Sequence, residues 1–144
     1  MSVEENKAVV HRYIEEVWNA GNLDLIDEMF APEYTNHSPS PGQTPGPEGL
    51  KQLITMFRDA APDLHLTVED MIGEGDEVVT RWTARGTHQG ELLGIPPTGK
   101  QIAMTAIVIE RFSGGRIVDH WAARDDLGLL QRLGVIPGPE PVAG

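Results

Sequence analysis

The chain has 144 residues, a length that fits one domain with a substantial hydrophobic core. Its 22 acidic residues against 11 Lys and Arg give a formal net charge of -11, which argues against nucleic acid or an anionic membrane as a partner. The absence of cysteine excludes disulfides, thiolate nucleophiles and thiolate metal sites. The N-terminus has no basic segment followed by an apolar run, and no apolar stretch is long enough to span a bilayer, so we expect a cytoplasmic protein.

The first half of the chain carries apolar residues at helical spacing. Residues 9–17 have them three and four positions apart, which predicts an amphipathic helix that a Gly-Asn pair then ends. A shorter helix is expected over residues 23–30. A third is expected over residues 47–61, because it opens with a proline and another proline follows its last residue.

The longest segment without a predicted helix or strand covers residues 33–49. Four prolines restrict its backbone, so we expect a stiff, ordered loop rather than a flexible linker. Long loops in compact domains are often functional, which makes this loop a candidate lid or pocket rim.

The second half of the chain alternates apolar and polar residues, as strands do. Strands over residues 66–72 and 78–88 are separated by a Gly-rich turn, and a loop over residues 91–99 follows them. The stretch 100–134 then predicts two strands joined by a Gly-Gly turn and a final helix over residues 126–133.

Helices that precede antiparallel strands indicate an α+β fold. The chain shows no internal repeat and no boundary between domains. We expect a single domain over residues 1–134 and a loose Pro/Gly-rich tail over residues 135–144.

The last predicted strand contains the first candidate for a catalytic group. Alternation places Trp121, Ala123 and Asp125 on one face of that strand. A carboxylate beside an indole is poorly solvated, so its pKa should rise and it would act as an acid or base near neutral pH.

Asp125 has a competing structural interpretation as the N-cap of the last helix. Asp is favoured there, and accepting backbone N–H bonds would lower its pKa instead of raising it. Asp126 competes for the same cap. From the residues alone, capping is the favoured interpretation of Asp125.

Four stretches of this sequence carry a resemblance to a known family. They are Tyr34-Thr35-Asn36-His37, Pro41-Gly42 with Gly46 ahead of a helix, GTHQGELLGIPPTGK at 86–100, and GGRIVDHWAARDDLGLLQRLG at 114–134. Together they span nearly the whole chain and resemble the SnoaL-like polyketide and ester cyclases of the NTF2-like superfamily. The resemblance implies a cone-shaped α+β fold, in which a curved antiparallel sheet wraps around N-terminal helices and encloses a central pocket.

The resemblance also implies a chemistry and its residues. Members of the family catalyse an intramolecular aldol closure without a cofactor, using an aspartate of the last strand as general acid/base. That position corresponds to Asp125, and the family's Asn-His pair near the pocket corresponds to Asn36 and His37. One departure is the apolar run over residues 106–109, where we expected a polar or histidine side chain. It argues against a large polyphenolic substrate.

Each candidate histidine can be interpreted as a structural or solvated residue as well as a functional one. His37 is either a solvated loop residue or a proton shuttle held over the pocket mouth. His88 is expected to be a hydrogen-bonded structural residue that also reaches the substrate. His120 falls on the strand face opposite Asp125, where we expect an ordinary surface pair with Asp119.

Further candidates line the predicted pocket. Arg81 is either a solvated surface residue, which is the favoured interpretation, or a donor to an oxyanion. The aromatic residues Tyr13, Phe57 and Trp121 are core residues that would also contact a flat apolar ligand. Five histidines without ligand spacing, and no phosphate-binding or nucleophile motif, argue against a metal or cofactor.

These features predict a cofactor-independent lyase, isomerase or cyclase for a mostly apolar carbonyl compound, with Asp125 and His37 as catalytic residues. An epoxide hydrolase or hydroxylase-like enzyme is a second reaction type. The alternative from another class is a non-catalytic ligand-binding or assembly module, in which Asp125 would be solvated or capping. Self-association as a homodimer is expected through the sheet face that the short helices leave uncovered.

Overall fold

The computed structural model describes residues 2–137 and has an α+β fold built on one curved sheet. The helical elements are α1 (Val3–Arg12), the π-helical turn η1 (Tyr13–Asn19), the 3-10 turn η2 (Leu23–Leu25), α2 (Ile26–Met29), α3 (Gly46–Ala60) and α4 (Asp126–Arg132). The strands are β1 (Phe30–Asn36), β2 (His65–Glu74), β3 (Glu77–Thr87), β4 (Gln101–Ser113) and β5 (Arg116–Arg124). The α+β class is confirmed. The domain boundary after residue 134 stays a prediction, and most of the predicted tail, residues 138–144, lies outside the described residues.

Local signals account for where the helices begin. Ser2 and Glu5 form a capping box at the start of α1, in which each side chain accepts a hydrogen bond from the backbone N–H of the other residue. Pro47 occupies the first turn of α3, where its missing N–H costs nothing. The predicted helices are therefore found, although the first continues from α1 through the π-helical turn η1 before it ends.

The five strands are ordered β1-β5-β4-β3-β2. The pairs β2–β3, β3–β4 and β4–β5 are antiparallel, as predicted, whereas β1 runs parallel to β5 at the edge. Strand β1 is a correction, because residues 33–36 were assigned to an irregular loop. Its polar residues and its proline hide the alternation, and the strand is held by pairing with β5, a contact that no local pattern reveals.

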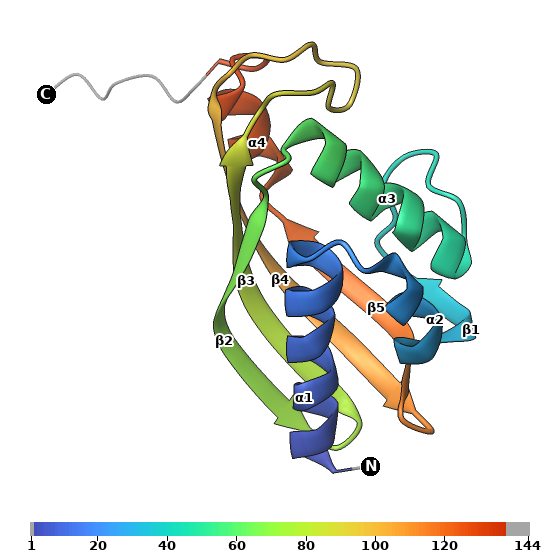
Figure 1. Ribbon diagram of the computed structural model, residues 1–144. Helices are drawn as coiled ribbons and strands as arrows, with labels where there is room; N and C mark the ends of the chain where they lie inside the picture. The colour runs from blue at the N-terminus through green and yellow to red at the C-terminus, as the bar shows by residue number, and fades with distance from the viewer. Residues whose placement is uncertain (1, 138–144) are drawn as a thin grey trace, which may run out of the picture.

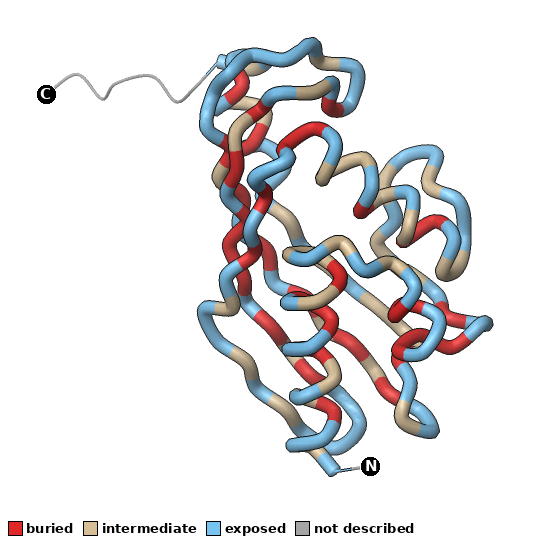
Figure 2. The backbone as a smooth tube through the Cα atoms, in the orientation of Figure 1, coloured by how far each residue is buried: buried red, intermediate tan, exposed pale blue. Residues whose placement is uncertain are grey.

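One face of the curved sheet is covered by helices (Figure 1). Helix α1 packs against β2 and β3, and α3 packs against β1. Buried segments follow β3, β4 and the sheet-facing side of α1, while the backs of the helices are exposed (Figure 2). The hydrophobic core therefore lies between the helices and the concave face, and a pocket opens into the same space.

Candidate active site

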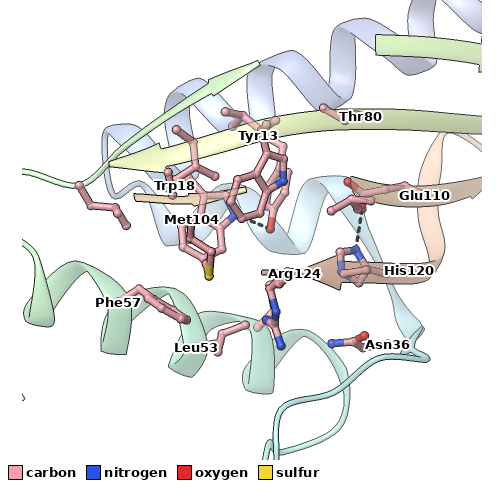
Figure 3. A pocket seen from close by; sticks show the side chains of 18 residues that line it. Tyr13, Trp18, Asn36, Leu53, Phe57, Thr80, Met104, Glu110, His120 and Arg124 are labelled. Carbon is pink, nitrogen blue, oxygen red and sulfur yellow. Dashed lines mark hydrogen bonds and ion pairs between the residues drawn. The ribbon is translucent and has the colours of Figure 1, made fainter. Parts of the chain in front are cut away.

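A pocket lies between the concave face of the sheet and the helices (Figure 3). Its empty volume is about 720 Å³, part of which is open to solvent. The wall is mostly apolar and aromatic, and its members are Tyr13, Ile14, Trp18, Asn36, Leu50, Leu53, Phe57, Leu64, Leu66, Thr80, Trp82, Ala84, Met104, Val108, Glu110, His120, Ala122 and Arg124. An apolar cavity with a few polar groups is the usual form of a small-molecule site.

Three polar groups of the pocket come from the neighbouring strands β3, β4 and β5. Glu110 of β4 is paired with His120 of β5, and both side chains point to the concave face. Thr80 lies one strand further along on β3, and its buried hydroxyl has no hydrogen-bond partner among residues 2–137. The register thus gathers carboxylate, imidazole and hydroxyl in one part of the wall.

Glu110, which is buried, and His120, which is partly buried, form a pair. His120 Nδ1 lies 3.3 Å from Glu110 Oε2, and the side chains are 16% and 3% exposed. An ionised Glu110 requires the proton on Nδ1, which leaves the lone pair on Nε2. Nε2 has no hydrogen-bond partner within the part of the chain that the structure describes. The pair can therefore present a basic nitrogen to a ligand.

Tyr13 supplies a donor close to this pair. Its hydroxyl accepts a hydrogen bond from Trp18 Nε1 at 2.8 Å, so its own proton is free to bond a ligand. Burial, together with the charge of Glu110, raises the pKa of Tyr13 well above its ordinary value. Tyr13 therefore stays protonated near neutral pH and keeps an O–H that can donate a hydrogen bond.

Two further polar side chains are held by the loop that follows β1. Asn36 Oδ1 accepts from the backbone N–H of Ser38 at 2.9 Å, which turns the amide nitrogen toward other partners. Arg124 Nη2 donates to Ser40 Oγ at 3.0 Å. The loop therefore fixes both side chains at the same side of the pocket, as Figure 3 shows.

The sequence profile of the SnoaL-like polyketide cyclases matches residues 8–133. The chain belongs to this family. The aklanonic acid methyl ester cyclase DnrD of Streptomyces peucetius is 31% identical over 136 residues, which cover 90% of this chain and 91% of that protein. The family resemblance and the expectation of a SnoaL-like enzyme, rather than a pure binding module, are confirmed.

Solved structures of similar proteins agree with the fold. IdmH of Streptomyces antibioticus, described as a putative polyketide cyclase, is 36% identical with a TM-score of 0.77, covering 90% of this chain and 99% of its own. AclR of Streptomyces galilaeus, described as a putative hydroxylase, is 31% identical with a TM-score of 0.85, covering 98% and 88%. The cone-shaped fold expected for a SnoaL-like chain is confirmed.

The prediction that Asp125 faces the pocket of this SnoaL-like protein is wrong. Asp125 is exposed and caps α4, since its Oδ1 accepts the backbone N–H of Gly128 at 2.9 Å. The side chains of His120, Ala122 and Arg124 face inward instead, one position out of phase with the predicted face. Asp125 is therefore the N-cap of α4, which is the interpretation that the sequence alone favoured.

His37 and Trp121 also lie outside the pocket, on the outer face of the sheet. Their rings are stacked with centroids 4.6 Å apart and planes 10° from parallel. His37 Nε2 donates to Asp119 Oδ1 at 2.8 Å, and Arg111 Nε donates to the same carboxylate at 2.7 Å. The expected shared space between Asp125 and His37 does not exist.

The remaining predicted residues divide between the pocket and other places. Tyr13, Phe57 and Asn36 line the pocket, as expected of substrate contacts. Arg81 is exposed on the outer face of β3. His88 is buried but lies outside the pocket wall, where its Nδ1 bonds the hydroxyl of Thr98 at 2.9 Å.

Sequence reasoning missed Glu110 as a pocket residue and placed His120 on the surface. A signal was present, because Ala106, Val108 and Glu110 share one face of β4 by alternation. The polar residue expected on this strand is Glu110, one position beyond the apolar run that was considered.

Two observations concern other kinds of site. Among residues 2–137, no three His, Asp or Glu side chains are grouped so that they would hold a metal ion. No helix in the described part of the chain is long and apolar enough to cross a membrane.

Proposed function

We propose that this protein is a general acid/base cyclase that closes a ring in a mostly apolar carbonyl compound without a cofactor. The supporting observation is the Glu110–His120 pair, which lies largely out of solvent in the wall of a mostly apolar pocket. The family's name and the aldol-type chemistry expected from the resemblance agree with this assignment.

His120 is the proposed base. Glu110 holds the imidazole in one orientation and keeps the proton on Nδ1, so that Nε2 removes a proton from a carbon next to a carbonyl. The imidazolium that forms is stabilised by the adjacent carboxylate. This role replaces the one first assigned to Asp125.

Tyr13 and Asn36 are the proposed donors to the enolate oxygen. Each has a free N–H or O–H, because its oxygen already accepts a bond from Trp18 or Ser38. Preorganised donors stabilise charge that develops in the transition state.

Ring closure completes the cycle without any net change in protons. The enolate carbon attacks a second carbonyl of the same molecule, a carbon–carbon bond forms, and the second carbonyl becomes an alkoxide. The alkoxide takes the proton from the imidazolium of His120, which restores the base. The substrate therefore needs two carbonyl groups within reach of each other, and the aromatic wall of Trp82 and Phe57 suits a flat molecule.

Proton exchange tests the first half of this cycle without the natural substrate. We expect the protein to accelerate deuterium uptake next to the carbonyl of α-tetralone in heavy water, followed by proton NMR. His120→Gln should lower the rate by about 100-fold, the usual contribution of a positioned base. The matched control is His37→Gln on the outer face, which should leave the rate within about twofold because His37 does not line the pocket. Equal rates in His120→Gln and in the wild type would refute the assignment.

The homodimer expected from the uncovered sheet face also stays a proposal, and we infer that it forms through the outer face. Ile72, Val79, Ile109 and Trp121 lie in one row across four strands in register. Ile107 on the same face is 52% exposed and Trp121 is 37% exposed. Light scattering should report a dimer for the wild type and a monomer for Ile107→Glu, since a charge in a packed apolar interface is costly. A monomeric wild type would end this proposal.

A further inference from the structure

The pocket contains one charged side chain that the proposed ring closure does not use. Arg124 lines the same wall as His120, four residues further along β5, and its side chain is 17% exposed. Four residues of strand separate the two Cα atoms by about 13 Å. The cation therefore lies further along the same wall of the pocket than the base.

The charge of Arg124 is poorly compensated. Its nearest carboxylate is Asp126, whose Oδ1 lies 4.0 Å from Nε and whose side chain is 62% exposed, a geometry that contributes little. The described partner of its Nη2 is the neutral hydroxyl of Ser40. Glu110, the acidic residue of the pocket wall, is bonded to His120. A guanidinium with several N–H donors that have no hydrogen-bond partner among residues 2–137 thus lines a mostly apolar cavity.

The surrounding loop holds this cation in place. Ser40 Oγ accepts from Arg124, and Ser38 Oγ accepts from the backbone N–H of Ala122 at 3.1 Å. The backbone N–H of Ser40 in turn donates to Gln43 Oε1 at 3.0 Å. A side chain whose position is fixed by such contacts loses little conformational entropy when a ligand binds.

We propose that Arg124 binds a carboxylate of the substrate, so that the substrate is an organic acid whose acidic end lies away from the carbon that His120 deprotonates. A planar guanidinium matches a carboxylate through two parallel N–H···O bonds, and partial burial strengthens that pair. The anion supplies the charge that the pocket lacks around Arg124. The pair also sets the direction in which an elongated apolar molecule enters, and hence which carbon meets the base.

This inference rests on the proposed function for the identity of the reacting end, but it is tested by binding alone. β-Naphthoate and β-naphthamide have nearly the same shape and differ in charge. Isothermal titration calorimetry at neutral pH and low salt should show that the wild type binds the carboxylate about tenfold more tightly than the amide, a difference of about 1.4 kcal/mol.

Arg124→Gln should remove this preference by weakening naphthoate while leaving naphthamide unchanged. Arg124→Lys should restore part of it, because the charge returns without the bidentate geometry. Arg81→Gln, an exposed arginine on the outer face, is the matched control and should keep the full preference. If Arg124 merely tied the loop to the sheet, Arg124→Gln would weaken both ligands equally.

Equal binding of the two ligands by the wild type, no measurable binding of naphthoate, or a preference that survives in Arg124→Gln would each overturn the inference. These outcomes are separate from the failure of the proposed function. His120→Gln should keep the charge preference, and a wild type that prefers naphthoate but exchanges no protons would overturn the acid/base assignment alone.

Discussion

The two faces of β5 each carry a histidine–carboxylate pair, and the pairs differ in their surroundings. On the outer face, Asp119 bonds both His37 and Arg111, and the His37 ring rests on Trp121. On the inner face, Glu110 bonds His120, and one imidazole nitrogen is left without a partner among residues 2–137. The side chain of His37 is 39% exposed, against 16% for His120.

The difference shows that residue type does not identify a catalytic pair. In the outer pair, Asp119 accepts hydrogen bonds from both His37 and Arg111, and the His37 side chain lies beside solvent. This pair therefore holds the start of the loop after β1 against β5. The hydrogen bond from His37, supported by Arg111, keeps the pKa of Asp119 below its usual value. The inner pair keeps an open bonding position inside an apolar cavity, which is the arrangement that acid/base chemistry needs.

The largest expected effect separates the two carboxylates by function. Glu110→Gln should lower α-tetralone exchange by about 100-fold, because the amide no longer orients the imidazole or stabilises its cation. Asp119→Asn should leave the exchange rate within about twofold, yet cost about 1 kcal/mol in the free energy of unfolding. Proton NMR measures the exchange rate, and urea denaturation measures the free energy of unfolding. A similar loss of rate in both variants would mean that the two pairs are not distinct.

The second prediction concerns a substitution that disturbs the pocket through the loop containing Ser40. Gly49 in α3 lies so close to Thr44 that a Cβ would come within 1.6 Å of the Thr44 carbonyl oxygen. Gly49→Ala must therefore displace the loop, at an expected cost of about 2 kcal/mol. It should also weaken naphthoate binding by loosening Arg124. Urea denaturation and calorimetry measure both effects, and Gln52→Ala on the same helix is the control. Unchanged stability in Gly49→Ala would contradict the close approach.

The third prediction concerns the buried phenols near Glu110. The chain has two tyrosines, Tyr13 and Tyr34, and burial together with the charge of Glu110 raises the pKa of each. An acid whose pKa is higher in the folded state lowers stability as the pH rises above its unfolded value of about 10. Ultraviolet titration should therefore show no tyrosinate in the folded protein near that pH. Tyrosinate should appear only with alkaline unfolding, whereas the urea-unfolded chain should titrate normally. Ionisation of either tyrosine near pH 10 in the folded protein would show that its hydroxyl is hydrated, and would contradict the prediction.

Much of this architecture is predictable from the sequence, because it rests on local patterns. The spacing of apolar residues in α1 and α3 and the alternation in β3 indicate the elements. The face of β3 that carries Val78, Thr80, Trp82 and Ala84 is the buried face, as the alternation grouped it. Strand β1 was missed because its parallel pairing with β5 joins residues more than 80 positions apart.

The site was less predictable because alternation groups residues into two faces without saying which one is inside. Trp121 suggested the buried face of β5, since tryptophan is usually buried. In this strand the inner positions belong to His120 and Arg124, which line the pocket, and the indole lies outside, stacked against His37. Which face of β5 points inward depends on its pairing with β4, and the alternation in β4 alone did not show which of its faces is buried.

The smallest expected effect belongs to Asp125, the residue first assigned to catalysis, and it tests the outer face directly. As an N-cap its carboxylate accepts the N–H of Gly128, a bond that an Asn side chain makes equally well. Asp125→Asn should therefore preserve both stability and proton exchange, although it removes the charge that a base would need. Asp125→Ala should cost about 1 kcal/mol of unfolding free energy, with exchange again unchanged. Urea denaturation and the α-tetralone assay distinguish the two roles. If Asp125 were the catalytic base, the exchange rate would fall in both variants. If Asp125 is only an N-cap, the exchange rate stays unchanged and Asp125→Ala alone is less stable.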